Sequence, residues 1–329
     1  LFLASWGRNV PVIVKGLTNI QGSWHPDVFI QECGSEQVTP IDCATDCDVE
    51  APCTIAEYFH AFKEGQFESP RKLKDWPPAD HFQTKLPQFH ESFGLAVPQG
   101  ACDVALLSGV QNLAIWYPLN GNPPDLGPKM YIATGDPHNS YGTTKLHLDV
   151  TDAVNILTYA PNPSEPAALW HLFPPESLSR LRQYLLDDGH WSAAQGDPIH
   201  CQKTYISEDM CKALQSRYGV QAVRIEQHLS DAVFIPAGWA HQVLNVQNAI
   251  KIACDFVSIQ NLGVTVSLMA EQRAHRIQSG GHGQDVLQLS TLMWHTWRAL
   301  TTFPQSLLSS TTKIRDSDDR VGNGPQLKD

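Results

Sequence analysis

The chain has 329 residues, of which 42% are hydrophobic and only 17% charged, so it can bury a sizeable core and is not disordered as a whole. Its 23 Lys and Arg against 34 Asp and Glu give a net charge of −11, which argues against strong direct binding to nucleic-acid phosphates. No apolar run is long enough to cross a bilayer, so we predict no membrane partner.

The N-terminal third is predicted to combine one strand, two helices and a long loop. A β-branched run at 11–14 predicts the strand, and 27–33 predicts a short helix. Thr54 with Glu57 three residues later forms a capping box, which predicts a second helix. Residues 64–100 are rich in Pro, Lys and Asp, and we interpret them as a surface loop with short turns.

Short strands, separated by turn residues, are predicted through the rest of the chain. Helices at 174–187 and 208–218 interrupt them, and two more at 265–278 and 285–300 follow the last strand. The strands are expected at 114–117, 130–133, 145–150, 155–159, 167–173, 220–227, 232–235, 242–246 and 250–257. The order is typical of antiparallel sheets, so the predicted fold class is mainly β with helical decoration, as a small barrel or double-sheet jelly roll.

The eight cysteines include no C-x-x-C pair, and their number is ordinary for a chain of this length, which favours a reduced compartment. Three of them, Cys43, Cys47 and Cys53, lie close together among aspartates. A small metal site is one interpretation. The spacing fits no zinc pattern well, so a loop with free thiols is favoured.

The sharpest chemical signal is the run His147-Leu148-Asp149. On a strand, residues two apart point to the same side, so this imidazole and carboxylate would share one face. One more imidazole completes the two-histidine, one-carboxylate set that holds non-haem Fe(II). His241, which follows a strand and a Pro-Gly turn, is the natural third ligand. The alternative is a chance pair on an exposed edge strand, and composition alone does not choose between them.

Three longer motifs resemble the JmjC domain, and more closely its KDM3 subfamily of histone H3 lysine-9 demethylases, which includes Hairless. They are GPKMY at 127–131, YGTTKLHLDVTDAVN at 141–155 and DAVFIPAGWAHQVLNV at 231–246, and shorter similar segments are KLKDWPP, DPIH, YGVQ and IKIACDFVS. The resemblance implies a double-stranded β-helix of the cupin, or jelly-roll, type. It also implies Fe(II) held by His147, Asp149 and His241, with 2-oxoglutarate and O2 as co-substrates.

By the same resemblance, residues 1–303 form a single JmjC catalytic domain. Its barrel is expected at about 105–260, with a helical insertion at about 174–218 and C-terminal helices at about 265–300. The polar tail at 304–329 is expected to be disordered. Because the chain does not begin with Met, we expect it to be a piece of a longer protein.

Three residues are candidate contacts to 2-oxoglutarate. Thr144 lies where JmjC proteins often place a hydroxyl for the distal carboxylate, and a turn role is the alternative. Asn155 is a candidate for the proximal carboxylate, or else makes a structural contact. The family's usual lysine is missing, because its neighbourhood reads Pro-Asn-Pro-Ser-Glu at 161–165. Lys251 is the replacement candidate, and the alternative is a solvent-facing lysine paired with Asp255.

Tyr131 is the candidate wall of the substrate pocket, because methylated ammonium groups are held by aromatic and oxygen-rich surfaces. Core packing is the equal alternative for Tyr131 and also for Trp239. The apolar stripe of the last helix is interpreted as core or dimer surface. Five other tryptophans are interpreted as structural: Trp76, Trp170, Trp191, Trp294 and Trp297.

The resemblance implies an Fe(II)- and 2-oxoglutarate-dependent histone lysine demethylase. Its expected substrate is the histone H3 tail, mono- or dimethylated at lysine 9, or another methyl-lysine peptide. The expected location is the nucleus, with chromatin contacted through flanking regions outside this chain. An acidic surface suits a basic tail. The alternatives are a protein hydroxylase of the same fold and a catalytically inactive chromatin scaffold. The missing lysine favours the scaffold, and the intact triad disfavours it.

Overall fold

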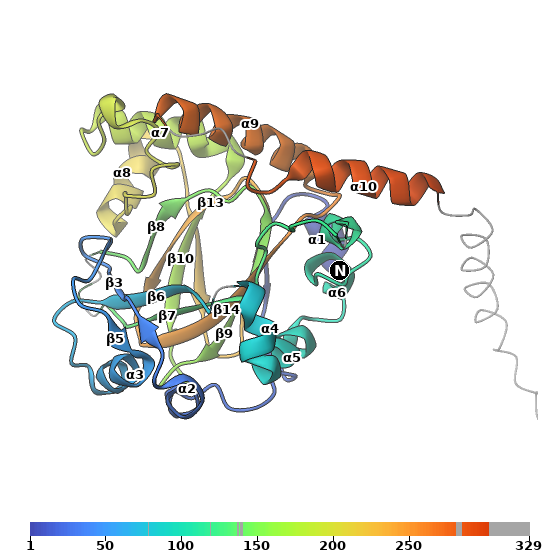
Figure 1. Ribbon diagram of the computed structural model, residues 1–329. Helices are drawn as coiled ribbons and strands as arrows, with labels where there is room; N and C mark the ends of the chain where they lie inside the picture. The colour runs from blue at the N-terminus through green and yellow to red at the C-terminus, as the bar shows by residue number, and fades with distance from the viewer. Residues whose placement is uncertain (78, 119, 137, 139–140, 281–284, 303–329) are drawn as a thin grey trace, which may run out of the picture.

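Two antiparallel sheets face each other in the computed structural model, which describes residues 1–302 apart from 78, 119, 137, 139–140 and 281–284 (Figure 1). The arrangement is the predicted double-stranded β-helix of the jelly-roll type, with helices around it. The predicted tail at 304–329 lies outside the described residues.

The larger sheet brings together strands from most of the chain's length. In spatial order it contains β1 (Val12–Val14), β12 (Ala232–Ile235), β9 (Asp152–Tyr159), β14 (Ala249–Phe256), β7 (Lys129–Ala133), β6 (Arg71–Trp76), β3 (Ile41–Asp42) and β4 (Cys47–Asp48).

The smaller sheet forms the opposite wall of the barrel. It contains β11 (Val223–Gln227), β10 (Ala168–Phe173), β13 (Ala240–Asn245) and β8 (Thr144–His147), and a separate ladder pairs β2 (Gln37–Val38) with β5 (Cys53–Thr54).

Helices precede the barrel, interrupt it between β10 and β11, and follow it. The first group is α1 (Phe2–Trp6), α2 (Pro26–Cys33), α3 (Ile55–Glu64), α4 (Ala79–Lys85), α5 (Pro87–Ala96), α6 (Cys102–Ala105) and the 3-10 helix η1 (Leu113–Trp116). The insertion holds η2 (Pro175–Ser177), α7 (Leu178–Asp187), η3 (Ala193–Gln195) and α8 (Glu208–Tyr218), and the C-terminal pair is α9 (Leu262–Gln278) and α10 (Leu289–Thr302).

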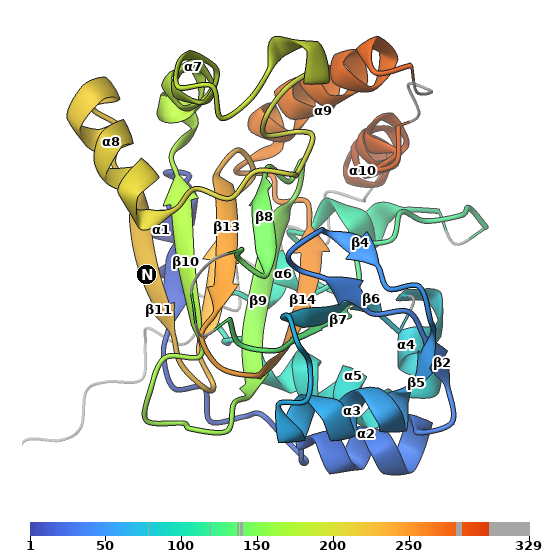
Figure 2. The ribbon, with the colours of Figure 1, turned by 90° about the vertical axis from the view of Figure 1, so that its left-hand side faces the viewer.

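The outer face of the larger sheet is covered by the N-terminal helices (Figure 2). Phe29 of α2, Phe59 of α3 and Phe89 of α5 belong to the same buried cluster as Ile250 and Ile252 of β14. Burying an aromatic or aliphatic side chain of this size stabilises the fold by roughly 1.5–3 kcal/mol. The helices therefore leave β14 buried on both faces, one against them and one inside the barrel.

The interpretation of residues 64–100 as a loop is wrong, because they contain β6, α4 and α5. Pro87 occupies the first turn of α5, where its missing N–H leaves no hydrogen bond unmade. Phe89 and Phe93, spaced four apart, face the core from that helix. Pro87, one of the prolines that suggested a loop, thus starts a helix.

Two predicted strands also differ from the structure. Residues 114–117 lie in and just after η1, whose first turn is capped by the Asn112 side chain. The strand predicted at 145–150 is shorter, because β8 ends at His147 and Asp149 lies in the connection to β9. Asp149 therefore reaches the position predicted for it from a loop and not from a strand.

The remaining predicted strands and helices match observed elements, with ends that differ by a few residues. The capping box at Thr54 is present. None of the eight cysteines forms a disulfide, and of the three clustered ones Cys47 and Cys53 lie in β4 and β5 and not in a loop as expected. Trp294 and Trp297 of α10 contact each other with tilted rings and are 55% and 57% exposed, so they do not pack in the core. No helix in the described part of the chain combines the length and apolarity needed to span a bilayer.

Candidate active site

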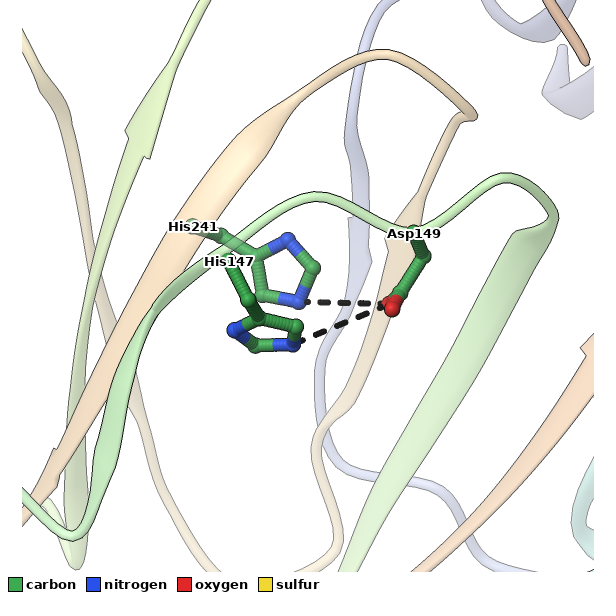
Figure 3. A group of neighbouring side chains, drawn as sticks. All are labelled: His147, Asp149 and His241. Carbon is green, nitrogen blue, oxygen red and sulfur yellow. Dashed lines mark ion pairs between the residues drawn. The ribbon is translucent and has the colours of Figure 1, made fainter. Parts of the chain in front are cut away.

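Three side chains meet at one end of the space between the sheets (Figure 3). His147 of β8 pairs directly across with His241 of β13, and the two ring centres lie 4.1 Å apart. The Asp149 Oδ2 atom lies 3.8 Å from His147 Nε2 and 3.6 Å from His241 Nε2. The three ligand atoms are all within 4.8 Å of one another, so a single metal ion can contact them all.

Both imidazoles are oriented for metal binding by a backbone carbonyl. His147 Nδ1 lies 2.8 Å from the Lys145 oxygen, and His241 Nδ1 lies 3.0 Å from the Trp239 oxygen. A carbonyl only accepts, so each Nδ1 carries a proton, and in the neutral form of the ring Nε2 is left to bind a metal. Burial and the neighbouring His147 lower the pKa of His241 to about 4, so this ring is neutral at physiological pH. The donor set fits Fe(II).

A cavity of about 360 Å³ extends from these ligands between the two sheets. That volume is suitable for a small organic ligand. Residues of β14 alternate between the cavity and the helical layer: Lys251, Ala253 and Asp255 line the cavity, whereas Ile250 and Ile252 pack against the helices. The polar face of β14 is thus its inner face.

Lys251 places a cation inside this cavity. It is only 4% exposed, and its Nζ atom donates to Asn245 Oδ1 at 2.7 Å and lies 5.6 Å from the centre of the Trp170 ring. Burial lowers the pKa of Lys251 to about 7. No carboxylate in the described part of the chain forms an ion pair with it, and a buried ammonium without a counter-ion is costly. Because Lys251 is buried and lines the cavity, the alternative of a solvent-facing lysine paired with Asp255 is wrong.

Comparison with known proteins agrees with this geometry. Residues 141–256, which carry all three candidate metal ligands and Lys251, match the family described as "JmjC domain, hydroxylase". They are a JmjC domain. Over 90% of its length the chain is 33% identical to Lysine-specific demethylase 3 of Drosophila melanogaster, 32% to Lysine-specific demethylase 3A-A of Xenopus laevis and 31% to Lysine-specific demethylase 3A of Homo sapiens. It spans 40%, 26% and 26% of those proteins, respectively.

Thr144 and Asn155 both line the cavity of the JmjC domain. Thr144 is the first residue of β8, paired with Val243 of β13, and so is not a turn residue. Asn155 lies in β9, and its side-chain oxygen accepts from Gln227 Nε2 at 3.4 Å. Their roles toward 2-oxoglutarate stay predictions.

Tyr131 lines the same cavity from β7. Its hydroxyl donates to Asp75 Oδ1 at 2.8 Å, and burial together with Asp75 and Asp255 raises the pKa of Tyr131 well above its usual value. The hydroxyl therefore stays protonated and holds Asp75 at the cavity wall. Trp239, by contrast, is buried and donates to the Asn9 oxygen at 2.9 Å, which agrees with the core-packing alternative.

Sequence reasoning missed several residues of the JmjC cavity, among them Asn245, Trp170 and Asp75. Asn245 had a usable signal, because the alternation of β13 places it on the same face as His241 and Val243. Trp170 was interpreted as structural. From β10, where it pairs with Val243 of β13, it packs in the barrel interior and also lies beside Lys251. No local pattern pointed to Asp75.

A second group of potential metal-ligating side chains already has cationic partners within the described residues. Asp197, His200 and Glu271 lie within 4.8 Å of one another. Arg182 Nε donates to Asp197 at 2.6 Å, the same guanidinium pairs with Glu271, and His200 Nε2 lies 2.9 Å from Glu271. Because an arginine already satisfies both carboxylates, we interpret this group as an ion-pair network that ties α7 to α9.

Proposed function

We propose that this JmjC domain is an Fe(II)- and 2-oxoglutarate-dependent dioxygenase that demethylates lysine in histone tails, with mono- and dimethylated lysine 9 of H3 as the substrate. The observation that carries the proposal is one cavity that holds a metal-ligand triad and a buried lysine with no counter-ion among the residues that the structure describes. 2-Oxoglutarate matches both features, since its keto-acid end chelates a metal and its other end is a carboxylate.

Different residues of the cavity bind the metal and the two ends of 2-oxoglutarate in this proposal. His147, Asp149 and His241 would hold Fe(II), which, when bound, supplies the chemistry that couples O2 to oxidation of 2-oxoglutarate and of the substrate. The Lys251 ammonium binds the distal carboxylate, and its burial strengthens this charge-assisted bond. The Thr144 hydroxyl assists there, and Asn155 assists at the proximal carboxylate.

The substrate side of the cavity suits a methylated ammonium group. Tyr131 offers an aromatic wall, and Asp75 and Asp255 add carboxylates along the same lining. A methyl group that is hydroxylated on such an amine leaves as formaldehyde and returns the lysine. The net charge of −11 favours approach of a basic tail. The names of the relatives, lysine-specific demethylases, support the same class of reaction. A histone substrate implies a nuclear location and contact with chromatin, which form part of this proposal.

Product analysis with methylated H3 peptides, Fe(II) and 2-oxoglutarate tests the proposal. We expect succinate and formaldehyde in equal amounts from peptides mono- or dimethylated at lysine 9. Succinate with a hydroxylated peptide and no formaldehyde would favour the protein hydroxylase. Neither product from any peptide would favour the inactive scaffold, whose main support, the missing lysine, is weakened by the position of Lys251.

A further inference from the structure

A fully buried carboxylate follows the metal ligands His147 and Asp149 closely in the chain. Asp152, the first residue of β9, is 0% exposed and lies three residues after Asp149. Its Oδ1 accepts from the Ala237 N–H at 2.8 Å and from Asn261 Nδ2 at 2.8 Å. Its Oδ2 accepts from the N–H of Ser258 at 3.1 Å and from the hydroxyl of the same residue at 2.5 Å. One side chain thus joins three separate segments.

Two of these segments lead directly to the site. Ala237 belongs to the turn between β12 and β13, four residues before His241. Ser258 and Asn261 belong to the turn between β14, which carries Lys251, and α9.

Two residues near the N-terminus, Trp6 and Asn9, form hydrogen bonds with the same network. Asn9 donates to the Ala237 oxygen and to Asn261 Oδ1, each at 3.1 Å, and accepts from Trp239 Nε1. Trp6 Nε1 donates to the Ser258 hydroxyl at 3.1 Å. The partners of Asp152 are therefore themselves held in place, so its carboxylate sits among prearranged donors.

Asp149 needs contacts of this kind to hold its position, because no strand ladder holds it. His147 and His241 are fixed by the ladder between β8 and β13, but this ladder ends at that pair. Asp149 follows in an irregular connection, and β9 begins only at Asp152. Its distance of 3.6 Å from His241 Nε2 therefore depends on how the 148–151 connection is held relative to the turn before β13.

We propose that Asp152 is a positioning residue that fixes the Asp149-bearing connection against the His241-bearing turn and so completes the metal site. This inference rests on the metal-binding part of the proposed function. A buried ionised carboxylate adds little net stability even when its hydrogen bonds are satisfied, because desolvation offsets them. Burial raises the pKa of Asp152 to about 6 against the opposing effect of its four donors.

Asp152→Asn tests this inference, because the amide keeps the size of the side chain but replaces one acceptor oxygen by a donor. We measure the dissociation constant of Co²⁺ as a probe metal, together with its visible absorption spectrum and the melting temperature of the metal-free chain. Loss of groups that orient metal ligands costs 10- to 100-fold in metal affinity, so we expect the dissociation constant to rise roughly 10-fold or more and the spectrum to change.

Asp231→Asn is the matched control. Asp231 is also buried, at 3% exposed, and accepts from the N–H groups of Gly16 and His228, but it lies at the other end of β12 from the metal ligands. We expect a comparable loss of melting temperature with an unchanged Co²⁺ dissociation constant. Asp152→Asn with native Co²⁺ affinity, or equal loss of affinity in both variants, would overturn the inference.

If Asp152→Asn does not fold, Asn261→Ala removes a single donor to the same carboxylate and gives a milder test. We then expect a rise of a few-fold in the Co²⁺ dissociation constant, and an unchanged constant overturns the inference. A wild-type chain that binds Co²⁺ but releases no formaldehyde contradicts the proposed demethylase while leaving the role of Asp152 intact. A wild-type chain that binds no Co²⁺ overturns both.

Discussion

The metal end of the cavity takes its two histidines from β8 and β13 of the smaller sheet and its carboxylate from the connection after β8. The lysine end combines β14 of the larger sheet with Asn245 of the smaller one. The metal end offers a carboxylate and two imidazole rings that backbone carbonyls orient, whereas the other end offers a cation whose burial lowers its pKa. A molecule that bridges the two must chelate at one end and carry a negative charge at the other.

Removing a metal ligand gives the largest expected effect, because it disables the metal end completely. For His147→Ala we expect metal affinity to fall by more than about 100-fold, since loss of outer-shell partners alone costs 10- to 100-fold. Turnover should fall below detection while the circular dichroism spectrum is retained. His60→Ala, on the exposed face of α3, is the control and should behave as wild type. An active His147→Ala variant would refute the metal assignment.

Replacing the cation disables the other end alone. For Lys251→Met we expect the KM for 2-oxoglutarate to rise on the order of 100-fold, because removing one partner of a buried charge pair costs about 2–5 kcal/mol. Metal affinity should be unchanged, and the melting temperature of the chain without ligand should not fall, because an uncompensated buried ammonium is removed. The exposed Lys203→Met is the control. A normal KM in Lys251→Met would exclude the proposed anion site.

The pH dependence of 2-oxoglutarate binding separates the two ends by titration. The pKa of Lys251 is about 7, so its ammonium is lost as the pH rises above this value. Affinity for the dicarboxylate should therefore fall by up to about tenfold per pH unit above neutrality. His241, with a pKa near 4, does not titrate in this range. In Lys251→Arg the decline should be absent, because arginine stays charged. A flat wild-type profile would argue against Lys251 as the binding cation.

The smallest effect is expected at the substrate wall. Tyr131→Phe removes the hydrogen bond to Asp75, which is worth about 0.5–1.5 kcal/mol. We expect kcat/KM for a methylated peptide to fall roughly 2- to 10-fold with an unchanged KM for 2-oxoglutarate. Tyr159→Phe is the control, because Tyr159 lies at the end of β9 and packs against the buried cluster that contains Phe29 and Phe59. A change in the KM for 2-oxoglutarate alone would place Tyr131 with the co-substrate instead.

The two ends also differ in how far sequence reasoning reached them. His147 and Asp149 were found from a spacing of two, although Asp149 turned out to lie beyond the strand that justified the spacing. His241 was found from its place after a Pro-Gly turn. Ligand chemistry is a property of residue type, so it survives errors in the exact ends of strands. The capping box at Thr54 and the breaks between strands were equally local and were confirmed.

Lys251 marks the limit of such reasoning. In most half-buried strands the apolar face points into the barrel, which made a solvent-facing lysine plausible. Here the apolar residues Ile250 and Ile252 point away from the cavity and pack in one cluster with residues of helices α2, α3 and α5. Residues 64–100 were misread as a loop, so part of that covering layer was missing from the sequence interpretation and nothing required β14 to be buried on both sides.

The sequence by itself determined the mainly antiparallel β-fold, the resemblance to JmjC domains and the three candidate metal ligands, because strand periodicity and ligand chemistry are local. Only the tertiary structure decided that Lys251 points inward, that Asn245 and Trp170 contact it, and that Asp152 joins the two halves of the site. Which face of a strand is inside depends on what covers the other face, and here helices distant in the chain provide that cover.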